Sequence, residues 1–79
     1  MSLEDRLTQS FAAVFPDLGA PEIRAATTKS VGEWDSMANI NLLCVIEEEF
    51  GIEIPGEDLE GLDSFAALLR YLQGRVELR

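Results

Sequence analysis

The sequence predicts an all-α fold, a small four-helix bundle of three main helices and one short helix. A chain of 79 residues has room for one hydrophobic core, so we expect a single domain over residues 1–79. Apolar residues recur at helical spacing in three segments, and no segment shows the alternation typical of a strand. Each of these segments ends at a residue that stops helices: Pro16, Gly51 and Gly74.

The first helix is expected from about Ser2 to Phe15. Ser2 and Asp5 have the spacing of a capping box, with Asp in place of the usual Glu. An apolar stripe follows, formed by Leu3, Leu7, Phe11, Val14 and Phe15. We interpret residues 16–34 as a long surface loop, whose helical content the sequence leaves open. The residues that could attach this loop to the core are Ile23, Ala25, Ala26, Val31 and Trp34.

The second helix should begin at Asp35 or Ser36 and end at Phe50, with Gly51 as the residue after its end. One apolar stripe should face the core: Leu42, Leu43, Ile46 and Phe50. A second stripe lies further around the helix: Met37, Ile40 and Cys44. Because a helix in a small bundle normally has one apolar face, the second stripe indicates a surface with a role beyond packing.

Two helices are expected in the remaining chain. Residues Glu57–Leu62 resemble a short helix of about one and a half turns. Asp63 or Ser64 should cap the last helix, which ends at Gly74, and residues 75–79 should fray. The apolar stripe of that helix is Phe65, Leu68, Leu69 and Leu72.

Composition excludes several classes of function. The formal net charge of −9 opposes binding to nucleic acid or anionic lipid and favours partners with basic patches. A lone cysteine and the absence of histidine argue against a disulfide, a metal site and a general base. Neither a membrane-spanning run nor a signal peptide can be read, so we expect a cytoplasmic protein without membrane insertion.

Acidic residues are concentrated in one part of the chain. All six basic residues lie outside residues 30–69, whereas that segment contains Glu33, Asp35, Glu47, Glu48, Glu49, Glu53, Glu57, Asp58, Glu60 and Asp63. A solvated helix face is the simpler interpretation, but such a face usually mixes charges of both signs. We therefore predict an uncompensated acidic recognition surface.

Ser36 is the main candidate for chemistry. An Asp-Ser pair before an apolar helix is usually an N-cap and nothing more. A serine at this place is also a hydroxyl at the positive end of a helix dipole, where a phosphodiester would be stabilised. No base lies nearby in sequence, so the hydroxyl is better suited to being modified than to acting as the nucleophile of a small hydrolase.

The sequence around Ser36 resembles the acyl carrier protein family. The family's pattern is Asp-Ser-Leu or Asp-Ser-Met, an apolar helix, Glu-Glu-Glu-Phe-Gly-Ile and a closing Ile-Pro. The corresponding residues here are Glu33 to Met37 and Cys44 to Pro55. The match is dense over about twenty residues, which makes it specific.

The resemblance implies the function. Ser36 would carry covalent 4′-phosphopantetheine, transferred from coenzyme A with Mg²⁺ held by the transferase. Asp35 beside it would help the transferase to hold the metal ion or to position the hydroxyl. The thiol of the arm would hold an acyl group as a thioester, so the carrier itself would have no catalytic residues and no metal. Partner enzymes would meet Met37, Ile40, Cys44, Glu47 and Glu48.

The expected partners follow from this role. They are a phosphopantetheinyl transferase of the holo-(acyl carrier protein) synthase type, an acyl-loading ligase or acyltransferase, and condensing or acyl-transfer enzymes with basic patches. We expect a monomer. Its interior would be lined by Leu42, Ile46, Phe50, Ile54 and Leu62, and in the family that interior can shelter an acyl chain.

Three positions depart from the family pattern. Ala38 and Asn41 replace acidic residues common in carriers of housekeeping fatty-acid synthesis, and Trp34 replaces a small residue. These changes favour a specialised carrier for polyketide, nonribosomal peptide, envelope-lipid or saccharide pathways. Two alternatives stay open: an aminoacyl or D-alanyl carrier, and an acidic interaction domain in which Ser36 is an unmodified cap.

Overall fold

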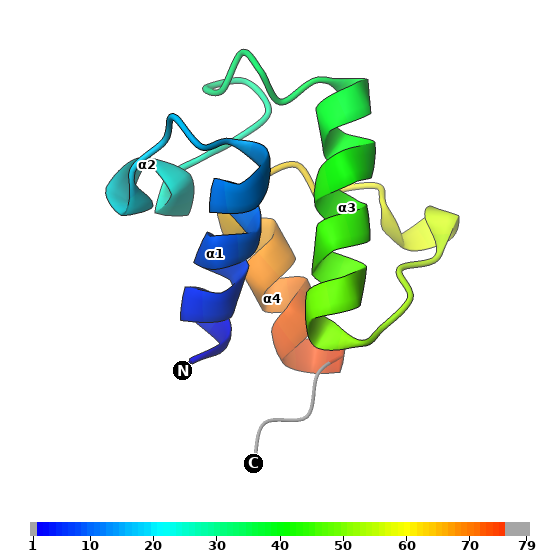
Figure 1. The fold of residues 1–79 in the computed structure, drawn as a ribbon. Coiled ribbons are helices and arrows are strands. Elements are labelled where there is room, and N and C mark those ends of the chain that lie inside the picture. The colour runs from blue at the N-terminus through cyan, green and yellow to red at the C-terminus, as the bar shows by residue number, and fades with distance from the viewer. Residues whose placement is uncertain (1, 76–79) are drawn as a thin grey trace.

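Residues 2–75 are described by a computed structural model, and they form a helical bundle (Figure 1). The elements in chain order are α1 (Leu3–Val14), α2 (Ala20–Arg24), α3 (Ser36–Phe50), a 3₁₀ turn (Gly56–Asp58) and α4 (Phe65–Arg75). No strand occurs between residues 2 and 75, although Thr27 and Ser64 form an isolated antiparallel bridge. The predicted all-α class is confirmed.

The core lies where α1, α3 and α4 meet. Helix α1 packs against each of the other three helices, and α2 also contacts α4. Most residues of the predicted apolar stripes are buried, and Leu7, Phe11, Leu42, Ile46 and Leu68 are fully inaccessible to solvent. Val14, Phe50 and Leu69 are only partly buried, and Ala25, which was expected to attach the loop to the core, is exposed. No helix in the described range 2–75 has the length and apolar character required to cross a bilayer.

The short helix does not lie where the sequence predicted it. The segment Glu57–Leu62 was expected to be helical, but only Gly56–Asp58 form a 3₁₀ turn, and Gly61 has a φ of 88°. That backbone conformation is open to glycine and interrupts a right-handed helix. The segment is therefore a chain of tight turns, with backbone bonds from Leu59 N to Gly56 O and from Leu62 N to Leu59 O.

The short helix lies instead within residues 16–34. Helix α2 has Pro21 in its first turn, and Gly19 N donates to Glu22 Oε1 at 3.2 Å. Proline is well accommodated there because the first helical N–H groups have no partner within the helix. Ile23, which is 1 % exposed, attaches the helix to the core.

The end of α4 also differs from the prediction. Arg75 was expected to fray, but it is the last residue of α4 and donates to Asp58 Oδ2 and to Glu53 O, at 3.2 and 3.3 Å. These bonds hold it in place. The other residues for which fraying was predicted, 76–79, lie outside the described residues.

Candidate functional site

Helix α3 begins with a division of roles between Asp35 and Ser36. Asp35 is the N-cap: its backbone is extended, and its carboxylate accepts from Ala38 N at 2.9 Å. Ser36 is therefore the first helical residue, and its side chain is exposed. The interpretation of Ser36 as a cap is wrong, because the neighbouring carboxylate already satisfies the helix N-terminus.

The residue before Asp35 is fixed in the core. Trp34 is 3 % exposed, and its ring meets Phe11 edge-on with centroids 5.3 Å apart. Its indole Nε1–H donates to Asn39 Oδ1 at 2.9 Å, so the polar end of the ring has a partner. The chain on both sides of Ser36 is thus held, by Trp34 before it and by α3 after it.

A small cavity lies beside Ser36. It has a volume of about 290 Å³ and is lined by Thr28, Trp34, Asp35, Ser36 and Asn39. These residues come from the loop after α2 and from the first turn of α3. The exposed hydroxyl thus stands at the edge of a hollow instead of on a flat surface.

The second apolar stripe of α3 faces away from the core. Met37 is 71 % exposed and Ile40 is 58 % exposed, which makes them the most exposed large apolar residues of the described chain. Cys44 is also exposed. The stripe thus begins directly beside Ser36, as the sequence predicted.

The two glutamates at the end of the stripe differ from each other. Glu48 is exposed. Glu47 is half-buried, and its Oε2 accepts from Ile54 N at 2.8 Å, which ties the chain after α3 back to the helix. Glu47 therefore has a structural role that the sequence did not indicate.

The acidic surface was predicted to lack compensating cations, but two of its acids form ion pairs with arginines. Arg6 Nε lies 2.9 Å from Glu49 Oε2, and Arg75 Nη1 lies 3.2 Å from Asp58 Oδ2. Both arginines lie far from their partners in sequence, which is why a count along the chain did not reveal these pairs. Most of the remaining acids of residues 30–69 are exposed and have no ion pair within residues 2–75.

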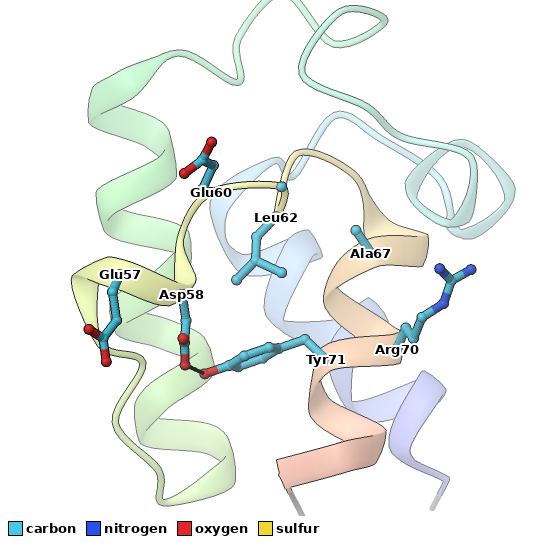
Figure 2. Close-up of a pocket in the computed structure, with 8 residues that line it drawn as sticks. Glu57, Asp58, Glu60, Leu62, Ala67, Arg70 and Tyr71 are labelled. Carbon is cyan, nitrogen blue, oxygen red and sulfur yellow. Dashed lines mark hydrogen bonds between the residues drawn. The ribbon is translucent and has the colours of Figure 1, made fainter.

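A second hollow, of about 440 Å³, separates the Glu57–Leu62 segment from α4 (Figure 2). Tyr71 reaches across it, and its hydroxyl donates to Asp58 Oδ2 at 2.7 Å (Figure 2). Burial of the phenol, and then its bond to Asp58, raise the pKa of Tyr71 above the ordinary value of 10.0. Arg70 points away from Glu57, Asp58 and Glu60 (Figure 2), so this hollow has no convergent set of groups suited to chemistry.

Sequence reasoning missed Thr28 and Asn39 at the site. Asn39 could have been suspected, because it lies three residues after Ser36 on the same helical face. Thr28 comes from a loop, and only the folded chain brings it near Ser36. Among residues 2–75 no cluster of acidic, cysteine or histidine side chains is placed to hold a metal ion.

Comparison with known proteins identifies a family. The family profile described as "Phosphopantetheine attachment site" matches residues 5–72. An acyl carrier protein of Thermosynechococcus vestitus is 33 % identical over 64 residues, which cover 81 % of this chain and 75 % of that protein.

A mitochondrial acyl carrier protein of Dictyostelium discoideum is 43 % identical over 47 residues, which cover 60 % of this chain and 38 % of that protein. The family carries its 4′-phosphopantetheine covalently on a serine. On the profile match and the relative from Thermosynechococcus vestitus, the chain belongs to the acyl carrier protein family.

Proposed function

We propose that this protein carries acyl groups on a 4′-phosphopantetheine arm attached to Ser36. The observation that carries this proposal is the exposed Ser36 hydroxyl at the first position of α3, with the cap supplied by Asp35. A phosphodiester on that oxygen would lie in the favourable field of the α3 N-terminus. The prosthetic group fits the site, because the hydroxyl opens onto the cavity of about 290 Å³.

The attachment is a phosphoryl transfer in which Ser36 is the acceptor. The Ser36 Oγ–P bond forms, the pyrophosphate bond of coenzyme A breaks, and 3′,5′-ADP leaves. The hydroxyl proton goes to a base supplied by the transferase, because the neighbouring Asp35 carboxylate is engaged in capping α3. Once attached, the arm supplies a terminal thiol on which an acyl group is held as a thioester.

The chain's own residues then present the arm and are recognised by partners. Asp35 keeps the first turn of α3 formed, so that Ser36 is displayed at a fixed place. Met37, Ile40 and Cys44 offer an apolar contact surface next to the arm, and such exposed patches commonly mark interaction sites. We assign Glu48 the main electrostatic contact with basic partners, and Glu47 a smaller one because its carboxylate also holds Ile54 N.

The partners that fit this role are a phosphopantetheinyl transferase and acyl-handling enzymes, namely a loading ligase or acyltransferase and condensing enzymes. We propose that residues 1–79 act as one carrier domain. Trp34, Ala38 and Asn41 support a carrier dedicated to a specialised pathway, such as polyketide synthesis. A cytoplasmic location stays a prediction, and one of the two relatives is named as mitochondrial.

The test is the intact mass of the protein before and after incubation with coenzyme A, Mg²⁺ and a broad-specificity phosphopantetheinyl transferase. The wild type should gain one phosphopantetheine, Ser36→Ala should gain none, and Ser30→Ala, which alters another exposed serine, should behave like the wild type. A folded, initially unmodified wild type that gains no mass would contradict the proposed function. It would instead favour an acidic interaction domain.

A further inference from the structure

The cavity beside Ser36 has a wall that attachment of the arm does not by itself require. Trp34 is the protein's only tryptophan, and its indole is hydrogen-bonded to Asn39 Oδ1 at 2.9 Å. Both side chains line the cavity together with Ser36. Neither Trp34 nor Asn39 is needed to make the Ser36 hydroxyl accessible, so the presence of this pair at the same hollow calls for a separate explanation.

We propose that Asn39, oriented by Trp34, is a positioning residue for the phosphopantetheine arm, and that these two side chains form a seat for its proximal end. This inference rests on the proposed function, because it takes Ser36 as the attachment residue. The ligand chemistry is the phosphate and pantoyl portion of the arm, which combines hydrogen-bond acceptors with two geminal methyl groups.

Asn39 supplies the donors of the seat. Its Oδ1 accepts the indole N–H, and this bond orients the side-chain amide. Both N–H bonds of Nδ2 are then left for other acceptors, and no acceptor for them occurs within residues 2–75. Asn39 lies three residues after Ser36 on α3, so the two side chains stand on one face of the helix.

The indole needs an acceptor, but it does not need an asparagine. A buried indole N–H requires one hydrogen-bond acceptor, which a carboxylate or hydroxyl would provide equally well. The amide provides that acceptor and adds a donor group at the cavity. The half-buried position of Asn39 limits competition from water for that donor. Trp34 and Thr28 also line the cavity and complete the wall against which the methyl groups can rest.

The test is nuclear magnetic resonance of the labelled protein before and after modification, with the modification verified by intact mass. The chain has two asparagines, Asn39 at the cavity and Asn41 exposed on the same helix, so Asn41 serves as the internal control. Resonances of the Asn39 side-chain amide and the Trp34 indole N–H should shift on modification. The geminal methyls of the arm should show nuclear Overhauser effects to Trp34 and Asn39 protons, and none to Asn41.

Two matched variants separate positioning from packing. Asn39→Asp keeps an acceptor for the indole and removes the two donors, whereas Asn41→Asp adds the same charge to the same helix. Both variants should gain one phosphopantetheine. The Overhauser effects should be lost in Asn39→Asp and retained in Asn41→Asp, while the indole N–H resonance stays at its hydrogen-bonded position in both.

The outcomes distinguish this inference from the proposed function. A modified wild type without contacts from the arm to Trp34 or Asn39 would overturn the seat and leave the carrier function standing. Contacts that persist unchanged in Asn39→Asp would overturn the role of Asn39. Absence of any mass gain would contradict the proposed function itself.

Discussion

At the start of α3, two neighbouring polar residues perform two different tasks. Asp35 accepts the hydrogen bond that caps the helix, and Ser36 leaves its hydroxyl exposed at the first helical position. The division matters because a hydroxyl engaged as a cap would be less available for modification. The structural cost of changing each residue should therefore differ.

We expect Asp35→Ala to lower the free energy of unfolding by about 0.5–2 kcal/mol, because it removes the cap. Ser36→Ala should change it by less than about 0.5 kcal/mol, as expected for an exposed residue away from a cap. Urea unfolding monitored by circular dichroism measures both. Asp35→Asn, which can still cap, should stay close to the wild type, and equal losses for the two alanine variants would contradict this division.

From the sequence, the N-cap of the helix could be either Asp35 or Ser36, and helix propensities do not choose between them. Both residue types are good caps, and the choice depends on which one has an extended backbone. In the structure Asp35 has the extended backbone, and it directly follows Trp34, which is buried in the core. The packing of Trp34 therefore bears on which residue caps α3, and helix propensities do not include such a contact.

Among the contacts between helices, Arg6 links α1 to the end of α3. Its guanidinium donates to the carboxylate and to the carbonyl oxygen of Glu49, and it lies 4.5 Å above the ring centroid of Phe50. The carbonyl belongs to the last turn of α3, where such oxygens lack partners within the helix. One side chain from α1 thus completes the C-terminal end of α3.

We expect Arg6→Met to lower the free energy of unfolding by about 1 kcal/mol. The loss is modest because the two charged side chains are 32 % and 41 % exposed, and solvent weakens such pairs. Chemical denaturation at low and high salt measures the loss, which should shrink as salt increases. The control is Arg70→Met, at an exposed arginine with no ion pair among residues 2–75. An equal loss of stability in that variant would argue against a specific contribution of the Arg6 contacts with Glu49 and Phe50.

Tyr71 links α4 to the Glu57–Leu62 segment and predicts a pH dependence. Because its pKa is raised in the folded protein, the bond to Asp58 should contribute stability below pH 10.0 and lose it as the pH rises through the raised pKa. Relative to Tyr71→Phe, the wild type should be about 1 kcal/mol more stable at pH 8. That difference should shrink toward pH 11.

The same denaturant series at pH 8, 9, 10 and 11 on both proteins tests this expectation. A difference that stays constant over that range would mean that ionisation of Tyr71 is not linked to folding. Other groups that titrate in this range are shared by the two proteins, so their effects cancel in the comparison.

The elements also show where sequence patterns succeed and fail. The three long helices were predicted because each has an apolar stripe that the core buries. The short helix was misplaced for two reasons. Residues 16–34 were interpreted as a loop, although Pro21 is tolerated in the first turn of α2, and Gly61 has a backbone conformation that no pattern of apolar residues reveals. Short segments depend on turn geometry more than on periodicity.

For the molecule as a whole, charge should govern association with basic partners. The net charge of −9 is spread over a surface on which Glu48 stands exposed beyond the apolar stripe of α3. Opposite charges on two proteins accelerate their encounter, and salt reduces this effect. The pairs Arg6–Glu49 and Arg75–Asp58 partly neutralise two acids of that surface, which could not be seen in the sequence.

We expect Glu48→Lys to slow association with the phosphopantetheinyl transferase several-fold at low salt, with the difference shrinking as salt rises. Stopped-flow or surface-based binding measures the association rate. Asp17→Lys makes the same change of charge at an exposed site in the loop after α1 and should have a smaller effect. Equal slowing by both variants would mean that net charge matters and the acidic face near α3 does not.

We have proposed that Ser36, among the five serines of the chain, carries the prosthetic group. Tandem mass spectrometry of peptides from the modified protein tests this, because it locates the added mass on one residue. We expect phosphopantetheine on Ser36 and none on Ser30 or Ser64. Modification of another serine would overturn the assignment of Ser36, and so would a protein with an unmodified Ser36 that still holds an acyl thioester.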